Sequence, residues 1–383
     1  MQLLALRHPL STSGGFAAPA AGEFSDHPNT AFAYTREGGY PMNSFKGHHI
    51  VVQRRGPPDV LSWTPVQVRA PATGEVRVRV EAAGVSGFDL MIRGHWFFGF
   101  TKPPYTPGED FVGIVDAIGP DVTSFTIGQR VTGWTFGQGG GYSEMIIRPA
   151  ETLVPVPDGV ESVTAAAIIT NYLTASLVLE KTAKVHPGER LLIHGAAGGL
   201  GSALLQLGSL ARFQMFGTGS DKSSDFIAEN GAVPINYKAE NFVRRIQDLT
   251  NDGVDVVIDV VGGPRQLWRS SRCLRRGGRL VMLGMASIYK SGAAIIPLSL
   301  LTAGTVALWP NGVSVPMSPS MLSFPAKNLD WYRDTLTDLL EKTAAGRLHP
   351  AIAAEVPMSE ATRAHSMLEA GGLVGKVVLT NSK

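Results

Sequence analysis

The segment LLIHGAAGGLGSALLQLGSLAR, from Leu191 to Arg212, decides the fold of this chain. It begins as a short apolar strand that ends at His194 and continues as an apolar run with helical spacing up to Ala211. Glycines form the turn between them: Gly195, Gly198, Gly199 and Gly201. Because glycine has no Cβ, such a turn adopts positive φ and approaches a pyrophosphate, which the free N–H groups of the helix start then bind. The segment predicts a dinucleotide site.

Short β-rich runs alternate with helical runs after this segment. The strand patterns cover 214–217, 234–236, 254–260 and 280–283. The helical patterns end at Gly231, cover 241–249 and run through Leu274. A glycine turn alone also fits a tight turn of any α/β protein, but this alternation favours a Rossmann-type, doubly wound parallel sheet with the turn after its first strand.

The end of the second strand, Gly217-Thr218-Gly219-Ser220-Asp221-Lys222-Ser223, bears on the choice of nucleotide. An acidic residue there holds the ribose 2′-hydroxyl of NAD, whereas a 2′-phosphate needs small polar groups and a cation. Ser220 and Lys222 therefore predict NADPH, with Asp221 as the opposing signal. The alternative for Lys222 is a solvated loop lysine.

The composition excludes several classes of protein. The chain has 383 residues, 44% of them hydrophobic and 17% charged, with a net charge of +2 and one cysteine, Cys273. This balance is typical of a globular chain of about two domains and gives no sign of nucleic-acid binding. One cysteine excludes an internal disulfide framework and predicts a reducing, cytoplasmic location. The apolar runs are shorter than the roughly 18 residues of a transmembrane helix, so none is expected.

The remaining sequence predicts a β-rich domain made from both chain ends. Residues 75–81 alternate strictly between apolar and charged side chains, and similar runs follow at 111–118, 130–134 and 142–147. The chain turns irregular after Met285, and then shows a helix at 330–345 and a final strand at 375–379. The expected divisions are a disordered extension (1–41), the first part of the β-rich domain (42–165), the nucleotide domain (166–308) and the return to the β-rich domain (309–383).

Four passages resemble the medium-chain dehydrogenase/reductase superfamily: GVSGFDLMIRG (84–94), PGEDFVGIVDAIGPDV (107–122), HGAAGGLG (194–201) and GLVGKVVL (372–379). Within it, the chain is most similar to the zinc-free quinone oxidoreductases, and the runs after Phe216 resemble the branch of the synaptic vesicle membrane protein VAT-1 homologue. The resemblance implies a Rossmann domain beside a GroES-like catalytic domain.

The zinc-dependent members of this superfamily hold their catalytic metal with cysteine, histidine and a neighbouring glutamate. The matching positions here are Ser86, Glu109 and Asp110. Tetrahedral zinc is usually held by thiolate and imidazole, so this set predicts no metal site.

The resemblance places the acceptor near Ser86, where the family has an asparagine, and Asp89. Asp89 alternatively holds local backbone or Arg93. In this superfamily a tyrosine that supplies a proton often follows Asp89 by two residues, but this chain has Met91 there. Tyr105 or Tyr172 is either a substitute for that tyrosine or a packed aromatic residue. We expect Ser86, Asp89 and Tyr105 to be the catalytic residues. Trp96, Phe97, Phe98 and Phe100 form either a stacking wall for the acceptor or ordinary core.

Both the glycine turn and the resemblance imply cofactor contacts. Tyr237 matches a position near the adenosine phosphate, or is a strand-end aromatic. The expected contacts are Thr174, Gly195, Ala196, Ala197, Gly198, Gly199, Leu200, Gly201, Gly219, Ser220, Lys222, Tyr237, Gly262, Leu283, Gly284, Met285 and Lys376.

Two classes of function follow. The first is a zinc-independent, NADPH-dependent reductase of quinones or related activated carbonyl compounds, with α,β-unsaturated ketones or aldehydes as alternative acceptors. The second is a nucleotide-binding module with peripheral lipid contact and little turnover. The resemblance also implies a homodimer.

Overall fold

The fold was analysed in a computed structural model, which describes residues 44–94, 102–283, 287, 292, 294–318 and 323–381. All of these residues lie within one compact unit, Ala31–Lys383. The expected N-terminal extension and the aromatic residues at 96–100 lie outside the described residues, as do Gly284 and Met285.

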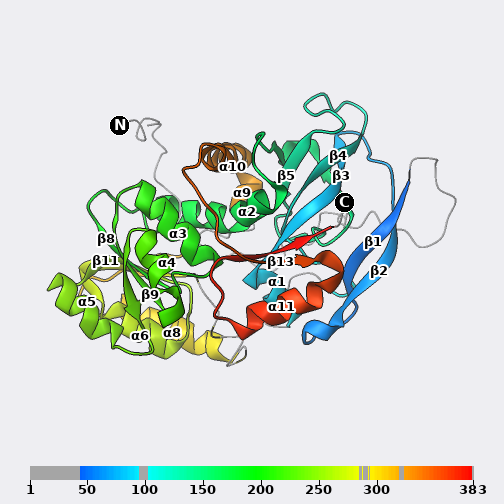
Figure 1. Ribbon diagram of the computed structural model, residues 1–383. Coiled ribbons are helices and arrows are strands. Elements are labelled where there is room, and N and C mark those ends of the chain that lie inside the picture. The colour runs from blue at the N-terminus through cyan, green and yellow to red at the C-terminus, as the bar shows by residue number, and fades with distance from the viewer. Residues whose placement is uncertain are drawn as a thin grey trace. The chain divides into compact units, whose positions relative to one another are not determined.

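A five-stranded parallel sheet confirms the predicted Rossmann-type domain (Figure 1). Its strands are β8 (Arg190–His194), β9 (Gln214–Gly219), β10 (Ala232–Asn236), β11 (Val254–Asp259) and β12 (Leu274–Met282). Their order in the sheet is β10-β9-β8-β11-β12, so the chain builds outward from β8 first on one side and then on the other. The strand order therefore reverses beside β8, the position at which α/β sheets bind ligands outside the carboxyl ends of their strands.

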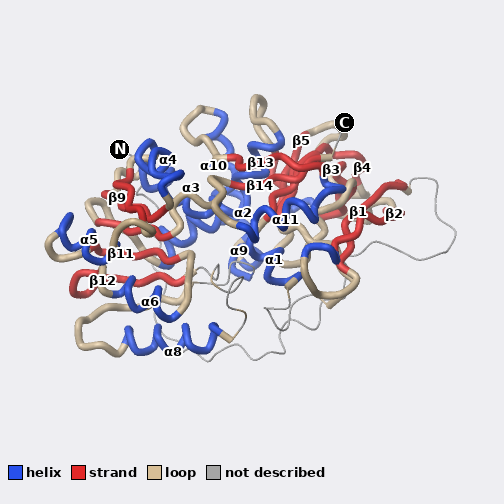
Figure 2. The backbone as a smooth tube through the Cα atoms, turned by 60° about the horizontal axis from the view of Figure 1, so that its bottom comes forward, coloured by secondary structure: helices blue, strands red, loops and turns tan. Residues whose placement is uncertain are grey.

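Helices cover both faces of this sheet because its strands are apolar on both sides. The helices are α3 (Gly199–Leu210), α4 (Ser224–Glu229), α5 (Phe242–Thr250), α6 (Pro264–Ser271) and α8 (Ile295–Ala307). Leu191 and Ile193 of β8 pack in one core cluster with residues of α3 and α4, whereas Leu192 packs in another with residues of α5, α6 and α8. Figure 2 shows α6 and α8 near β12.

The structure differs from expectation at the end of α6 and in the region after β12. Helix α6 ends at Ser271, and Leu274 is already the first residue of β12, so the helix predicted to run through Leu274 is too long. Helices α8 and α9 (Ser323–Lys327) lie in the region predicted to be irregular. The sequence of α8, IIPLSLLTAGTVA, is apolar nearly all round and so carries no helical period that would reveal it.

The β-rich part forms a seven-stranded sheet and a two-stranded ribbon. The larger sheet contains β3 (Glu75–Val85), β4 (Asp110–Ile118), β5 (Arg130–Trp134), β6 (Met145–Pro149), β7 (Leu153–Pro155), β13 (Ile352–Pro357) and β14 (Lys376–Thr380). The ribbon pairs β1 (Phe45–Val52) with β2 (Leu61–Val68). Strand β14 runs antiparallel to β3, which confirms that the two ends of the chain fold together. In Figure 1 the red C-terminal strand lies beside the cyan β3.

Other helices connect or cover these sheets: α1 (Gly87–Arg93), α2 (Ser162–Leu177), α10 (Leu329–Ala344) and α11 (Ala361–Ala370). Single turns lie at Pro58–Val60, Ala150–Thr152, Val178–Thr182, Asp221–Ser223 and Met358–Glu360. The helix Ser162–Thr182 is long and apolar enough to span a membrane, but 72% of its apolar window is buried inside the protein. It packs against α3, β3 and β4, as a core helix does.

Candidate active site

The glycine turn joins β8 to α3 and leaves its backbone free to bind an anion. Gly195 has φ +67°, and Gly198 caps α3 without any side-chain hydrogen bond. The N–H groups of Gly199, Leu200 and Gly201 have no partner within the described part of the chain. Unpaired N–H groups at the start of a helix are the usual binding groups for phosphate.

Two glycines of this turn are required for different reasons. A Cβ on Gly201 would lie 2.2 Å from the carbonyl oxygen of Gly195, so this position is needed for close packing of helix and turn. A Cβ on Gly198 would meet only that same oxygen, at 3.5 Å, which is an ordinary contact. The absence of a side chain at Gly198 therefore leaves open space in front of the helix start.

The candidate NADPH contacts at the second strand lie together at the carboxyl ends of β9 and β10. The N–H of Tyr237 donates to the carbonyl of Gly219 (3.2 Å), and the Tyr237 side chain is 54% exposed. Lys222 is exposed and has no hydrogen bond or ion pair to any described residue. Ser223, one position later, is buried and donates to the carbonyl of Ser220 (2.8 Å). A free cation therefore lies at 222, while position 223 faces inward.

The opposite end of the predicted site follows β11 and β12. Asp259 accepts hydrogen bonds from the N–H groups of Val261 and Gly262, both at 2.9 Å, and this fixes the turn after β11. The N–H of Leu283 donates to the carbonyl of Asp259 (3.0 Å), so the two strand ends lie side by side. Gly262 and Leu283 thus share the carboxyl edge of the sheet with the glycine turn.

The β-rich domain contacts the glycine turn through Gly375. Its N–H donates to the carbonyl of Ala197 (2.8 Å), and it forms a bridge with Gly198. The next residue, Lys376, is buried, with its ammonium 3.4 Å from a carboxylate oxygen of Asp110. The Lys376 side chain is therefore held in a buried ion pair. Its contact to the cofactor stays a prediction, and the backbone of Lys376 is more available for that contact than its ammonium group.

Helix α2 contributes polar residues that sequence reasoning missed. Thr170 donates its hydroxyl to Asp110, and the next residue, Asn171, lies against the glycine turn, since a Cβ on Gly199 would be 2.6 Å from its amide nitrogen. Thr174 donates its hydroxyl to the carbonyl of Thr170 (2.6 Å), one turn back. Thr174 was predicted as a cofactor contact, whereas Thr170 and Asn171 were not, and the available signal for them was a polar side chain in a largely apolar helix.

Ser86 and Asp89 form a reciprocal cap at the start of α1. The Ser86 hydroxyl donates to Asp89 (2.6 Å) and accepts from the Asp89 N–H (3.2 Å), while the Ser86 N–H donates to the Asp89 carboxylate (2.9 Å). The N–H of Gly108 donates to the other Asp89 oxygen (2.9 Å). Asp89 thus holds local backbone, one of its two expected structural roles, and Arg93 pairs instead with Glu369.

The two tyrosines differ in availability. The Tyr172 hydroxyl donates to Gln206 (2.9 Å) and is committed to the core. The Tyr105 hydroxyl is buried, has no described hydrogen-bond partner and lines a small cavity. Burial, and then the nearby Asp89, raise the Tyr105 pKa above its usual value, so it stays protonated. Of the two candidates, Tyr105 is the one that lies beside Asp89.

The cavity beside Tyr105 has a volume of about 10 Å³, enough for about one water. Its lining is Asp89, Ile92, Tyr105, Pro107, Glu109, Gly137 and Gly139. Glu109 is 3% exposed, and one of its oxygens accepts from the Thr135 hydroxyl (2.9 Å) and the Gly137 N–H (2.8 Å). Burial and the charge of Asp89 raise the pKa of the Glu109 carboxyl to about 8.

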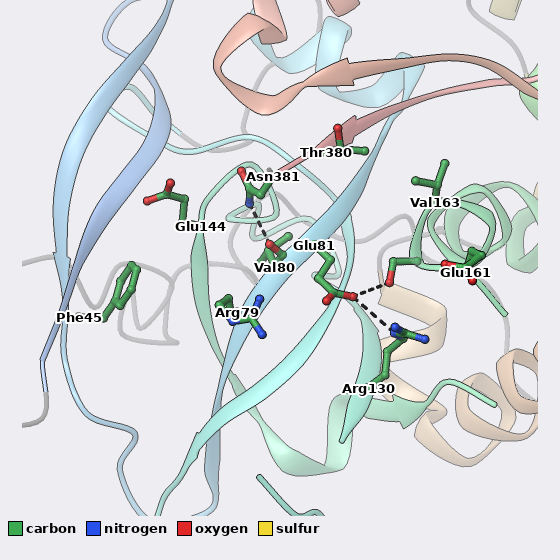
Figure 3. A pocket seen from close by; sticks show the side chains of 11 residues that line it. Phe45, Arg79, Val80, Glu81, Arg130, Glu144, Glu161, Val163, Thr380 and Asn381 are labelled. Carbon is green, nitrogen blue, oxygen red and sulfur yellow. Dashed lines mark hydrogen bonds and ion pairs between the residues drawn. The ribbon is translucent and has the colours of Figure 1, made fainter. Parts of the chain in front are cut away.

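A roomier cavity of about 300 Å³ lies elsewhere, and no predicted site residue lines it (Figure 3). Its charged lining is largely paired: Glu81 accepts from the Ser162 hydroxyl (2.6 Å) and lies 3.4 Å from Arg130. Its size alone does not make it the active site, because the glycine turn and the carboxyl edge of the parallel sheet are not part of it.

The donor set at the zinc-equivalent positions does not fit a metal. The Ser86 hydroxyl is used in the helix cap, and Asp110 is used by Lys376, Thr170 and the N–H of Gly84. Among the residues that the structure describes, no three histidine, cysteine, aspartate or glutamate side chains are grouped to hold an ion.

Comparisons with known proteins agree with this architecture. Residues 72–158 match the family model of the alcohol dehydrogenase GroES-like domain, and residues 231–379 match that of the zinc-binding dehydrogenases. The chain is 30% identical to the quinone oxidoreductase of Rattus norvegicus over 329 residues, which cover 85% of this chain and 94% of that protein. It is 29% identical to the synaptic vesicle membrane protein VAT-1 homolog of the same organism over 331 residues, 83% of this chain and 80% of that protein.

A solved structure gives the same result. The Escherichia coli quinone oxidoreductase complexed with NADPH superposes with a TM-score of 0.77 at 28% identity, over 87% of this chain and 99% of that one. Together with the Rossmann-type sheet, the glycine turn and the β-rich domain built from both chain ends, these matches show that the chain belongs to the zinc-free, quinone oxidoreductase-like group of the medium-chain dehydrogenase/reductase superfamily.

Proposed function

We propose that this protein is a zinc-independent reductase that uses NADPH to reduce quinones or related activated carbonyl compounds. The observation that carries the proposal is the glycine turn: three unpaired N–H groups at the start of α3, with open space in front of Gly198. The family supports an oxidoreductase with an NADPH-type cofactor, and the quinone acceptor is our inference from its relatives.

The residues at the carboxyl edge of the parallel sheet support NADPH as the cofactor. The N–H groups of Gly199, Leu200 and Gly201 would bind the pyrophosphate, and Lys222 would bind the 2′-phosphate, with the exposed Tyr237 ring beside the adenosine. Gly262 and Leu283 would line the nicotinamide end. When bound, NADPH supplies the hydride for the reduction.

The contribution of the chain's own residues near the acceptor is to hold the surrounding elements in position. Ser86 and Asp89 hold the start of α1 rigid, and the buried Asp110–Lys376 pair fixes β4 to β14 beside the glycine turn. Quinones suit a site without a metal, because hydride addition gives an aromatic product that needs little further stabilisation.

The test is NADPH oxidation, followed by the loss of its absorbance near 340 nm, with ortho-quinones, para-quinones and an enone, each with and without a chelator. Quinone-dependent turnover that survives the chelator is the expected result. Turnover of the enone alone would show that the acceptors are α,β-unsaturated carbonyl compounds instead of quinones. NADPH binding without turnover of any acceptor, combined with salt-sensitive co-sedimentation with anionic vesicles, would favour the nucleotide-binding lipid module instead.

We also propose that the protein is a homodimer, as the resemblance implies. Exposed apolar side chains on α8 support it: Leu298, Leu300 and Leu301 are each more than half exposed. Sedimentation velocity tests the mass, and a monomer at micromolar concentration would contradict the proposal.

A further inference from the structure

Glu109 presents one carboxyl oxygen that the described protein leaves unused. It lies directly before β4, and its Oε2 accepts both hydrogen bonds that the carboxyl makes, from Thr135 and from Gly137. Its Oε1 has no hydrogen-bond partner among the described residues, and it is not one of the fully enclosed polar atoms. Glu109 also lines a cavity with room for about one water, so its carboxyl has one oxygen without a described partner and lies beside that space.

The groups around Glu109 act in both directions: burial and Asp89 favour its protonated form and outweigh Thr135, Gly137 and Arg148, which favour its carboxylate. Asp89 on α1 and the neutral Tyr105 share its cavity, and Arg148 on β6 is the nearby cation. Two buried carboxyls this close hold a single charge more easily than two. Burial raises the pKa of Asp89 as well, but Asp89 accepts three hydrogen bonds, two of them from backbone N–H groups, which favour its carboxylate, so it is the better site for that charge. Glu109 keeps its proton, consistent with its raised pKa of about 8.

A short series of contacts connects Glu109 to the nucleotide site. The next residue, Asp110, pairs with Lys376, and Gly375 beside it bridges to Gly198 of the glycine turn. Across the same junction, Thr170 donates to Asp110 while its neighbour Asn171 lies against Gly199. The backbone at Glu109 is therefore connected to the glycine turn through Asp110, while its side chain lines the cavity that it shares with Asp89 and Tyr105, which we expect to lie near the acceptor.

We propose that Glu109 is the general acid of this reductase, and that it donates the proton on Oε1, through the water of the cavity, to the acceptor oxygen. The proposal rests on the proposed reductase function. It assigns the proton-donating role to a carboxyl at a position where the superfamily's zinc enzymes have a histidine. It also accounts for a chain that has Met91 in place of the expected tyrosine.

The step balances as follows. The acceptor receives a hydride, hence two electrons, and its oxygen takes up a negative charge. The Oε1–H bond of Glu109 breaks, a proton passes through the water, and an O–H bond forms on the acceptor oxygen, which leaves Glu109 as carboxylate. A proton from solvent restores the acid after each turnover. The sum is one NADPH, one acceptor and one proton converted to NADP⁺ and the doubly reduced acceptor.

The test compares Glu109→Gln with Glu81→Gln. The amide of Glu109→Gln still accepts from Thr135 and Gly137 but carries no acidic proton, and Glu109→Asp is the partial restoration. Glu81 is the matched control, because it is a half-buried glutamate of the same domain that lines the separate cavity of Figure 3. Turnover is measured against pH with acceptors whose reduced oxygens range from weakly to strongly basic.

We expect wild-type kcat/KM to fall as the pH rises through about 8, since the proton is then lost from Glu109. Glu109→Gln should lose this pH dependence and lower kcat by about 100-fold for acceptors with strongly basic reduced oxygens, with little loss for weakly basic ones. Glu109→Asp should recover part of the rate, and Glu81→Gln should match wild type. Equal losses for every acceptor, or none, would overturn the proposal.

A readout without turnover separates this inference from the proposed function. Infrared difference spectra of the nucleotide-free protein should contain a protonated-carboxyl band that disappears above about pH 8 and is missing in Glu109→Gln. A band already absent at pH 7 would overturn the assignment of the proton to Glu109. Wild-type protein with this band but without turnover of any acceptor would refute the reductase function instead.

Discussion

Replacing Gly198 by valine separates the nucleotide site from the fold. Gly198 has φ −70° and ψ 173°, an extended conformation that valine adopts readily. Its new Cβ would meet only the carbonyl oxygen of Gly195, at 3.5 Å. The protein itself therefore accommodates the new Cβ, and we expect a cost of about 1 kcal/mol for a poorer helix cap. The branched side chain would occupy the space in front of the N–H groups of α3.

The expected loss is in nucleotide affinity. A hydrogen bond to a charged group contributes about 1.5–3 kcal/mol, so displacing the pyrophosphate from one or two N–H groups costs about 1.5–6 kcal/mol. This corresponds to an increase in the dissociation constant for NADPH of roughly 10- to 20,000-fold. Isothermal titration calorimetry measures the affinity, and thermal unfolding of the unliganded protein measures the fold.

The matched comparison is Gly201→Val. Its Cβ would lie 2.2 Å from the Gly195 carbonyl oxygen, so this variant should lose thermal stability as well as binding. Unchanged NADPH affinity in Gly198→Val would refute the assignment of the helix start to the pyrophosphate. A melting temperature lowered as far as in Gly201→Val would refute the separation of site from fold.

Three further substitutions test the surrounding residues. Lys222→Ala should narrow the preference for NADPH over NADH by about 1–2 kcal/mol of binding free energy, because the lysine side chain is free to bind the 2′-phosphate. Equal losses of affinity for both nucleotides in a titration would contradict this. Ser86→Ala should lower the free energy of unfolding by about 1 kcal/mol through loss of the cap with Asp89, and lower kcat more than NADPH affinity. Lys376→Met should lower the free energy of unfolding, measured in urea, by about 3–5 kcal/mol because Asp110 keeps a buried charge. Adding Asp110→Asn should restore much of this stability. Additive losses in the double variant would show that the pair is not coupled.

Local patterns predicted the parts of the site that depend on backbone. Glycines between a strand and a helix indicate their turn wherever they occur, because only the missing Cβ permits Gly195 its positive φ and Gly201 its close packing. The polar end of β9 indicated Lys222, because residues that follow a parallel strand emerge at the carboxyl edge of the sheet. These predictions concern neighbours in sequence, and the structure places their residues together.

Helix α8 was missed because its apolar residues show no helical periodicity. Its side chains are apolar on every face, although Leu298, Leu300 and Leu301 are exposed. The position of Asn171 and the role that we propose for Glu109, which the sequence indicated only as a zinc-equivalent residue, could not be predicted for another reason. Asn171 lies on α2, ahead of β8, and reaches the glycine turn only when the helix packs on α3; Glu109 acquires its environment only when α1 brings Asp89 to the same cavity.

The sequence by itself determined the alternation of strands and helices from β8 to β12, the glycine turn and the side chains that follow β9, since these depend on periodicity and on the φ that each residue can adopt. Only the tertiary structure decided the state of the buried groups. Lys376 is paired with Asp110, the Ser86 hydroxyl donates to Asp89, and burial beside Asp89 raises the pKa of Glu109. The physical reason is that burial and charge act through space, between residues that the chain keeps far apart.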